Sequence, residues 1–471
     1  MKNFNLAIQT GIYPDELKIA KVIPIFKSGD TTECTNYRPI SVLSIIDNIF
    51  ERILKKRMVE YLEKFNILYE YQFGFREGHS TTHALVEIID NIKESIDKNN
   101  MTCGIFVDLS KAFETVNHHI LLAKLENYGF RGKAYELLSS YLSNRKQYVQ
   151  LNDHKSSYKP ISCGVPQGSV LGPLLFLIYI NDIANCCPQE KTRIYADDTN
   201  IFFDSNNVDD ISERAHQIMV QLDKWFIANK LTLNAKKSSF TIFRSLRSKT
   251  KNLPDKLVFN KSEIIRSATV TYLGVLLDEH LTFKNHVQKV CNSIKMYFKV
   301  FYNIRRYISS KQIEILYYSL IYSRIKYGIT VYGYSSKTNM QKIQTLQNQI
   351  LKVLSNEHFR FPTKDIHNRY NLLLVKDIFY QEKLTFVFNY TNNNLPVVFD
   401  NYYTYFSDVH GISTRYAHEK CILPSCNTNL GLNSQRVNGA QLWNELDSSF
   451  KVCSNVKMFR SSIKNKILLY K

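Results

Sequence analysis

The sequence predicts a mixed α+β fold, and three observations carry this prediction. The apolar run from Cys103 to Val107 is typical of a buried strand. β-branched and aromatic residues flank the turn at 196–198 and indicate two short strands. From 283 to 308, apolar residues recur at the spacing of an amphipathic helix. We therefore expect a sheet in the middle of the chain and helices after it.

The remaining elements are predicted in chain order. Helices are expected at 45–65 and at about 81–97, before the central strands near 103–108, 194–203 and 240–244. The polar stretch from 245 to 256 is rich in Lys, Arg and Ser and predicts a mobile loop. Residues 259–263 read as the turn of a hairpin, and a second helical pair is expected at 310–327 and 339–354.

The first central strand ends at an acidic residue, Asp108. A carboxylate at the end of a buried strand requires a reason, because ionised groups are costly to remove from water. One reason is capping of the turn or helix that follows, since Asp is a favoured N-cap residue. The other is a functional site, in which several carboxylates from separate segments hold metal ions that act on a phosphate.

The stretch from Gly164 to Pro173 contains three glycines and two prolines in ten positions. Such a composition excludes the interior of an ordinary strand or helix and predicts a rigid turn. A helix is expected to start near Pro173, because proline is favoured in the first helical turn. The glycines would let a ligand approach the backbone, although a tight structural loop accounts for them equally well.

Two adjacent carboxylates, Asp197 and Asp198, lie at the tip of the predicted hairpin. A tip of this kind suits a hard divalent cation such as Mg2+, which prefers oxygen ligands. An Asp-Asp turn can also be an ordinary solvated loop. Together with Asp108, however, the pair supplies the three carboxylates that two-metal chemistry on phosphates requires.

The charge balance favours a polyanionic partner. The chain has 471 residues and a formal net charge of +19, with a pI near 9.3. A membrane surface could also attract this charge, but the longest apolar run is far shorter than the roughly 20 residues needed to span a bilayer. The N-terminal residues have no signal-peptide pattern, so nine cysteines are expected to be free thiols in an intracellular protein.

These segments, in this order, resemble the reverse transcriptases of non-LTR (LINE-type, jockey-like and CR1-like) retrotransposons. The resemblance extends over roughly the first three quarters of the chain. The two catalytic motifs and the template and nucleotide-positioning motif are FVDLSKAFETVNH at 106–118, YADD at 195–198 and GVPQGSVLGPLLF at 164–176. The other matching segments are PIFKSGD at 24–30, NYRPISVLS at 36–44, QFGFREGHST at 72–81, LNAKKS at 233–238 and YLGV at 272–275. Eight motifs in the correct order are far more specific than any one of them.

The resemblance implies RNA-directed DNA synthesis with two Mg2+ ions, or Mn2+ in their place. Asp108, Asp197 and the Leu109 carbonyl would hold the ions, with Asp198 assisting. Lys27, Arg38 and Lys237 would contact the triphosphate or the pyrophosphate that leaves. An RNA template, a DNA primer and deoxynucleoside triphosphates are the partners implied, and no membrane partner is expected.

Further residues acquire roles through the resemblance alone. Phe113 would be the steric gate that excludes a ribose 2′-hydroxyl, although an aromatic after a strand is commonly plain core. Gln167 and Gly168 would position the nucleotide. The segment Tyr272-Leu273-Gly274 would form a primer-grip strand.

The resemblance also implies a right-hand polymerase architecture. Fingers and the fingers–palm connection would occupy residues 1–100, and a palm with part of the fingers would occupy 101–282. A helical thumb would follow at 283–360, and a small, mainly helical C-terminal region of unknown role at 361–471. The palm would combine an antiparallel sheet with helices.

Other hypotheses remain open at this point. The chain could be a truncated nucleic-acid-binding remnant without activity, or an intron maturase, which has a similar core. Family members generally carry an upstream endonuclease, and Met1 lies almost immediately before the fingers motifs, so we expect a fragment of a retroelement. Use of chromosomal primers would require a nuclear location.

Overall fold

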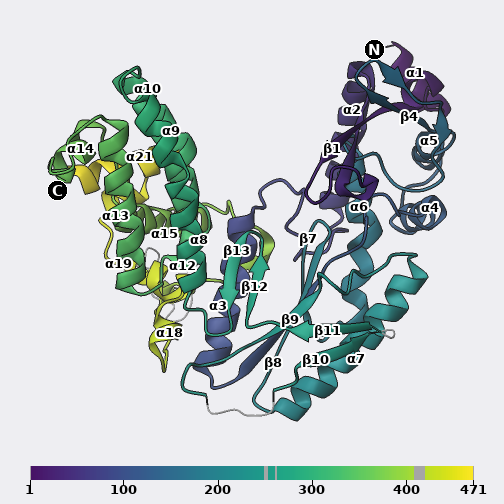
Figure 1. Ribbon diagram of the computed structural model, residues 1–471. Helices are drawn as coiled ribbons and strands as arrows, with labels where there is room; N and C mark the ends of the chain where they lie inside the picture. The colour runs from purple at the N-terminus through teal and green to yellow at the C-terminus, as the bar shows by residue number, and fades with distance from the viewer. Residues whose placement is uncertain (1, 249–252, 260–261, 408–419, 470–471) are drawn as a thin grey trace.

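The computed structural model describes residues 2–248, 253–259, 262–407 and 420–469. The chain forms three lobes that together have the shape of a U (Figure 1). One arm holds the first strands and helices, the base holds the central sheet, and the other arm holds helices from later in the chain. The combination of a mainly antiparallel central sheet, in which β11 and β9 pair in parallel, with surrounding helices confirms the predicted α+β fold class.

The base of the U is a six-stranded sheet with the strand order β10-β11-β9-β3-β8-β7. Its strands are β3 (Met101–Val107), β7 (Lys191–Tyr195), β8 (Asp198–Ser205), β9 (Ser239–Phe243), β10 (Lys256–Phe259) and β11 (Ser262–Arg266). β3 is central, antiparallel to both β8 and β9, and buried along its whole length. The three strands predicted for the middle of the chain are therefore confirmed, and they are neighbours in one sheet.

Helices cover both faces of this sheet. They are α3 (Thr81–Asp97) on one face, and α6 (Gly172–Ile180) and α7 (Val208–Ala228) on the other. Phe106 of β3 packs in the hydrophobic cluster of α3, whereas Ile105 and Val107 pack with α6 and α7. Alternate residues of a strand point to opposite faces, so a wholly apolar strand is the expected sequence for this position.

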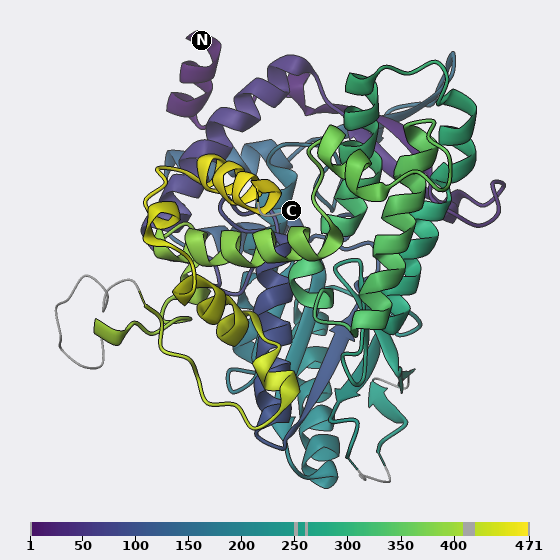
Figure 2. The same cartoon turned by 90° about the vertical axis from the view of Figure 1, so that its left-hand side faces the viewer.

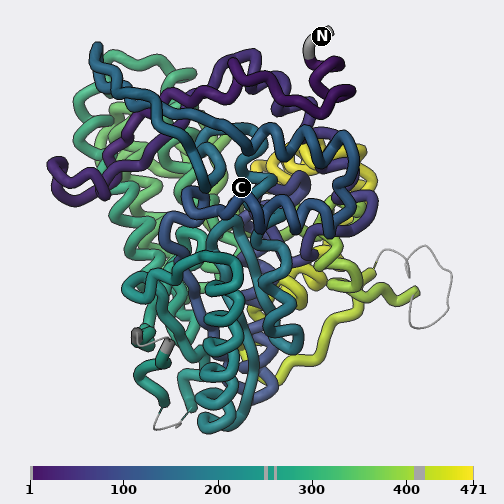
Figure 3. The backbone as a smooth tube through the Cα atoms, turned by 90° about the vertical axis from the view of Figure 1, so that its right-hand side faces the viewer, coloured from purple at the N-terminus to yellow at the C-terminus, as the bar shows by residue number. Residues whose placement is uncertain are grey.

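The arm that holds the N-terminus contains a second sheet. β1 (Ile19–Phe26) pairs antiparallel with β2 (Tyr37–Val42) and parallel with β4 (Lys146–Leu151), and the short strands β5 (His154–Lys155) and β6 (Lys159–Pro160) pair with β4. The helices of this arm are α1 (Lys2–Thr10), α2 (Ile45–Lys64), α4 (His118–Asn127) and α5 (Lys133–Leu142). Figure 3 shows this arm above the base, with α1 at the edge of the molecule.

The other arm is helical. It contains α8 (Lys284–Lys295), α9 (Tyr297–Ile304), α10 (Ser310–Leu316), a π-helical turn (Tyr317–Tyr322), α11 (Ser323–Lys326), α12 (Ile329–Tyr332) and α13 (Lys337–Leu354). The helix predicted at 283–308 is thus divided at Met296, whose backbone keeps helical dihedral angles. The helical pair predicted at 310–327 and 339–354 is confirmed, although a π-helical turn interrupts its first member.

The C-terminal residues are mainly helical and share one core with the second arm and with α3. The elements are α14 (Thr363–Arg369), α15 (Val375–Thr391), α18 (Asn429–Leu432), a π-helical turn (Gln435–Gly439), α19 (Ala440–Asn444), α20 (Ser448–Lys451) and α21 (Val456–Leu469). Asp97 at the end of α3 accepts hydrogen bonds from the backbone of Asn427 and Thr428, and Asp90 accepts one from the backbone of Arg436. Figure 2 shows these segments beside α3.

Two predicted turns fall partly outside the described residues. β10 and β11 pair as the predicted hairpin, but residues 260–261 of its turn are not described. The predicted loop at 245–256 includes residues 249–252, which also lie outside the described residues. Within the described residues, no helix is both long enough and apolar enough to cross a membrane.

Candidate active site

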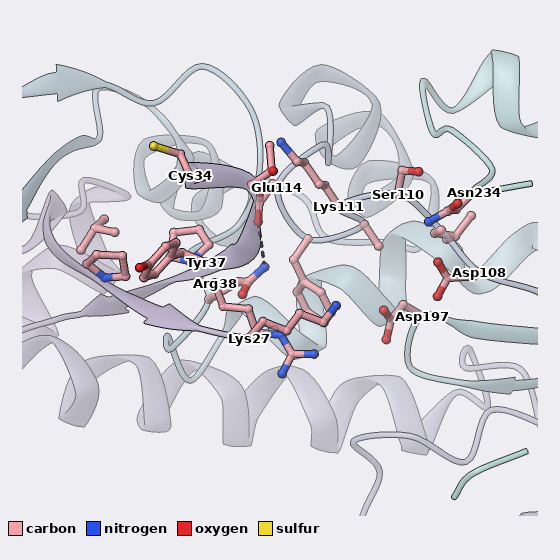
Figure 4. Close-up of a pocket in the computed structure, with 18 of the residues that line it drawn as sticks. Lys27, Cys34, Tyr37, Arg38, Asp108, Ser110, Lys111, Glu114, Asp197 and Asn234 are labelled. Atoms are coloured by element: carbon pink, nitrogen blue, oxygen red, sulfur yellow. Dashed lines mark hydrogen bonds between the residues drawn. The ribbon is translucent and has the colours of Figure 1, made fainter. Parts of the chain in front are cut away.

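The structure brings the three predicted carboxylates together. Asp108 directly follows β3, Asp197 lies in the turn between β7 and β8, and Asp198 begins β8. Because β3 and β8 pair with Val107 opposite Thr199, the end of β3 lies beside the hairpin tip. Figure 4 shows Asp108 next to Asp197. All three residues line one cavity of about 1100 Å³.

The carboxylates lie in an environment that lacks full compensation for their charge. Burial, followed by repulsion from Asp197 and Asp108, raises the pKa of Asp198 to about 6. Burial and repulsion from Asp108 also raise the pKa of Asp197, against the opposing effect of Arg38 and Lys27. The ammonium of Lys237 lies 3.9 Å from the Asp108 carboxylate, and both side chains are well exposed, so this ion pair is weak.

Leu109 lines the cavity, and the hydrogen bonds around it indicate the direction of its carbonyl. The Asn234 N–H donates to the Asp108 carbonyl, and the Ser110 N–H donates to the Thr232 carbonyl. Leu109 is therefore the non-hydrogen-bonded residue opposite Leu233, and its carbonyl points away from that segment. β9 and β8 flank β3 on opposite sides, so this carbonyl faces the side on which the aspartate hairpin lies.

These groups fit divalent cations, which take carboxylate and carbonyl oxygens. Within the described residues, no three His, Cys, Asp or Glu side chains form a ready-made metal cluster. The ligand set that the sequence resemblance implies contains three carboxylates, Asp108, Asp197 and Asp198, and the Leu109 carbonyl. In the described residues these carboxylates line one cavity without forming such a cluster. Burial and the nearby Asp108 carboxylate raise the pKa of Asp197, and a bound cation would offset both effects.

A segment that sequence reasoning did not assign to the site supports the hairpin tip. Residues 71–73 run beside β7, because the Ile194 N–H donates to the Tyr71 carbonyl and the Phe73 N–H donates to the Ile194 carbonyl. The buried side-chain oxygen of Gln72 accepts from the N–H groups of both Gly74 and Ala196. Ala196 has a positive φ of 58°, and this bond helps to hold it there.

Gly74 is the closest point of this contact. A Cβ at Gly74 would lie 2.3 Å from the backbone nitrogen of Ala196, a distance that real side chains do not reach. Position 74 therefore requires glycine because two backbones approach closely there. A left-handed conformation is not the reason, since Gly74 does not have a positive φ. The motif at 72–81 marked this segment in the sequence, but it did not predict the contact of the segment with the β7–β8 hairpin.

Lys27 and Arg38 approach the cavity from the arm that holds the N-terminus. Lys27 directly follows β1 and Arg38 is the second residue of β2, and the hydrogen bond from the Lys27 N–H to the Asn36 carbonyl closes the connection between the two strands. Figure 4 shows them across the cavity from Asp108 and Asp197. These two basic residues thus lie across the cavity from the two acids, whereas Lys237 lies beside Asp108.

The loop after Gly164 connects this arm to the base. The Ser41 N–H of β2 donates to the Gln167 carbonyl, and a Cβ at Gly168 would lie 2.3 Å from the Ser41 carbonyl oxygen. The Gln167 amide donates to the Glu114 carboxylate at 3.3 Å, and both side chains line the cavity. Gly168 permits the close contact with β2 and lies outside the cavity lining.

Glu51 of α2 anchors the same loop and was not anticipated. Its fully buried carboxylate accepts hydrogen bonds from the N–H groups of Val170 and Leu171 and from the Tyr141 hydroxyl. Burial raises the pKa of Glu51, and these donors oppose that effect. A buried acid on a helix gives no distinctive sequence signal, because its partners lie 90 to 120 residues away.

Phe113 lines the cavity on the side of α6. Its ring stacks on Phe176 with centroids 4.5 Å apart, and the Phe75 ring meets its edge at 6.3 Å. The ring is therefore held in place and only partly buried, as a residue that limits the size of a ligand must be.

The predicted strand at Tyr272-Leu273-Gly274 is wrong in one respect. β12 (Thr269–Tyr272) and β13 (Val275–Asp278) form a hairpin, and Leu273 and Gly274 are its turn. Both turn residues have positive φ, 44° and 79°, which is the conformation of tight hairpin turns. Tyr272 is buried beside Phe106 and supports the hairpin from the core side, outside the lining of the cavity.

Sequence comparison finds relatives of this chain among polymerases of fly mobile elements. The jockey RNA-directed DNA polymerase of Drosophila melanogaster is 29% identical over 77% of this chain and 40% of its own length. Polymerases of the fly transposons BS and X-element, described as probable, are 27% and 28% identical, each over 79% of this chain and 42% of their own lengths. The chain thus spans about two fifths of these relatives.

Among solved structures, telomerases of Candida albicans and Candida tropicalis are similar at TM-scores of 0.38 and 0.41, with 13% and 10% identity. Each match covers 78% of this chain. The matches cover 65% of the Candida albicans chain and 62% of the Candida tropicalis chain. Scores of this size carry no further conclusion. Residues 25–277, more than half of the chain, match the family described as reverse transcriptase (RNA-dependent DNA polymerase). The chain therefore belongs to the reverse transcriptase family.

Proposed function

We propose that the chain is the RNA-directed DNA polymerase of a non-LTR retrotransposon, which extends a primer 3′-hydroxyl with deoxynucleotides on an RNA template. The observation that carries this proposal is the meeting of Asp108 and Asp197 in a cavity that Lys27 and Arg38 enter from the opposite side. Acidic groups suit metal ions and basic groups suit a triphosphate, so the two sides match the two parts of a metal-bound nucleotide. The names of the fly relatives support the same activity.

Asp108, Asp197 and the Leu109 carbonyl would hold two Mg2+ ions, or Mn2+, with Asp198 assisting. Bound ions would lower the pKa of the primer hydroxyl and neutralise the pyrophosphate that leaves. Lys27 and Arg38 would bind the triphosphate and orient its α-phosphate. Lys237 would neutralise the pyrophosphate or give it a proton.

Stabilisation by a metal ion should depend on pH. The folded-state pKa of Asp198, about 6, lies above its ordinary value of 3.8, so the metal-free fold loses stability as pH rises between these values. Metal binding needs the ionised carboxylates and therefore strengthens above that range. We expect Mn2+ to raise the melting temperature more at a pH of about 7.5 than at about 5.

Thermal unfolding with and without MnCl2 at both pH values measures this effect. The Asp198→Asn variant is the matched comparison, because it removes the titrating carboxyl and should flatten the pH dependence. An equal Mn2+ effect at both pH values in the unmodified protein would contradict the assignment.

Phe113→Ala should weaken discrimination against ribonucleotides. The Phe113 ring stacks on Phe176, has an edge contact with Phe75 and lines one side of the cavity. Removing the ring opens that side. We expect the ratio of deoxynucleotide to ribonucleotide incorporation to fall by about tenfold or more, with deoxynucleotide incorporation retained. If Phe113 is plain core, the variant should instead lose about 3 kcal/mol or more of stability and keep its selectivity.

Primer extension on a homopolymer RNA template, with Mg2+ and separately with Mn2+, tests the proposed function. A polymerase lengthens the primer in a metal-dependent reaction. A folded protein that binds the template–primer duplex but never extends it would instead be the inactive remnant.

A further inference from the structure

The turn between β12 and β13 is held by side chains of the helical arm. The Tyr327 hydroxyl, just after α11, donates to the Leu273 carbonyl at 2.6 Å. The Lys289 ammonium, from α8, donates to the Gly274 carbonyl at 3.0 Å. Both carbonyls of a two-residue turn are thus bound by the neighbouring lobe.

Packing at this contact is reciprocal. A Cβ at Gly274 would lie 3.3 Å from the Tyr327 ring, so the ring rests directly on the turn. A Cβ at Gly328, the next residue after Tyr327, would lie 2.8 Å from a methyl group of Val275 in β13. Glycine on each side allows the close approach, and both glycines also have positive φ.

The turn that Tyr327 holds is joined to the β7–β8 hairpin through the core. Tyr272, just before the turn, lies beside Phe106 of β3 with ring centroids 6.2 Å apart, and Tyr195 and Leu273 both pack against the hydrophobic cluster that contains these two rings. Tyr195 ends β7 and pairs with Asp198 across the hairpin. Tyr327 itself is 42% exposed, which leaves part of its ring open to solvent beside the site.

We infer that Tyr327 is a positioning residue through which the helical arm fixes the Leu273–Gly274 turn against the catalytic hairpin, and so aligns the primer 3′ end with Asp108 and Asp197. This inference rests on the proposed polymerase function. Beyond that function, the inference states that side chains of the helical arm, with the Tyr327 hydroxyl beside the Lys289 ammonium, help to set the position of the turn, which the hairpin alone does not fix.

The substitution Tyr327→Phe tests the inference, because it removes the donor and keeps the ring. One hydrogen bond of ordinary strength corresponds to about a 3- to 10-fold change in an equilibrium. We expect KM for the template–primer to rise by about that factor, and extension of a mismatched primer end to change more than that of a matched end. KM for the nucleotide should stay constant, since the turn lies outside the nucleotide cavity.

The matched control is Tyr302→Phe, the same chemical change on α9, at an exposed ring that lies under the Arg305 guanidinium. It should leave both KM values unchanged. Hydrogen–deuterium exchange over residues 270–278 is the second readout, and exchange should become faster in Tyr327→Phe only.

The outcomes separate the two proposals. If the unmodified protein fails to extend primers, the polymerase function is wrong, and the exchange measurement still tests whether Tyr327 holds the turn. If the unmodified protein is active and Tyr327→Phe matches it in both KM and exchange, the inference about Tyr327 is overturned.

Discussion

Replacing either Asp108 or Asp197 by Asn is expected to lower single-turnover primer extension by about three decades or more. Each carboxylate would hold ions whose charge stabilises the transition state by several kcal/mol, and each decade of rate corresponds to about 1.4 kcal/mol. Asn keeps the shape of the side chain but removes the charge, so the loss should appear in the rate of chemistry with little change in template–primer affinity.

Although Asp197→Asn should lower primer extension, it should keep or raise the stability of the fold. Burial and repulsion from Asp108 raise the pKa of Asp197, so its ionised form is disfavoured in the metal-free fold at neutral pH. Removing that charge should leave the melting temperature equal to or above that of the unmodified protein. A variant that is as stable as the parent but inactive separates a role in chemistry from a role in folding.

Asp153→Asn is the control for this pair, because Asp153 is exposed in the connection between β4 and β5. It should extend primers at the normal rate. Extension at a near-normal rate by Asp108→Asn or Asp197→Asn would contradict the metal-binding assignment.

Gly74→Ala is expected to have the second largest effect. Its Cβ would meet the Ala196 backbone nitrogen at 2.3 Å, and backbone cannot move aside as the end of a side chain can. Either the aspartate hairpin or residues 71–75 must shift, and the bond from Ala196 to Gln72 is then lost. Displacement of a catalytic group by about 1 Å can cost roughly a hundredfold in rate, and overpacking costs about 1–3 kcal/mol of stability.

Gly78→Ala provides a matched control in the same loop. A Cβ at Gly78 meets nothing within 4 Å, and its φ is +73°, so the change costs backbone strain without a clash. We expect a loss of about 1 kcal/mol in unfolding free energy and normal extension. Single-turnover extension and thermal unfolding measure both variants, and a normal rate for Gly74→Ala would show that the contact does not position the hairpin.

The local elements could be predicted because their signals are local. α2 and α3 follow Ser44 and Ser80, each of which caps its helix by accepting a hydrogen bond from the third residue beyond it. β3 is buried on both faces, and the apolar run from Cys103 to Val107 predicts this burial. Asp108 and the hairpin tip stood out because acids are unusual next to such strands.

The supporting contacts could not be predicted, because they join residues that are distant in sequence. β4 pairs with β1 across more than 100 residues, and no local pattern specifies a parallel partner. Gln72 reaches Ala196 across 124 residues, and Tyr327 reaches Leu273 across 54. Such residues look like ordinary polar or aromatic positions until the fold brings their partners close.

The turn at Leu273–Gly274 shows a different limit. The predicted strand rested on the family resemblance alone, and Leu273, a residue type that rarely adopts positive φ, gives no local sign of a turn. Contacts from Tyr327 and Lys289 help to hold the turn instead, which is a tertiary effect that outweighs local preference.

The most direct test of the account is copying of an RNA template of defined sequence with one deoxynucleotide omitted in each reaction. The account predicts that a DNA primer is extended in the presence of Mg2+ or Mn2+ and stops one position before the base that requires the omitted nucleotide. It would be contradicted by folded protein that binds the duplex without extending it, or by nucleotide addition that ignores the RNA sequence.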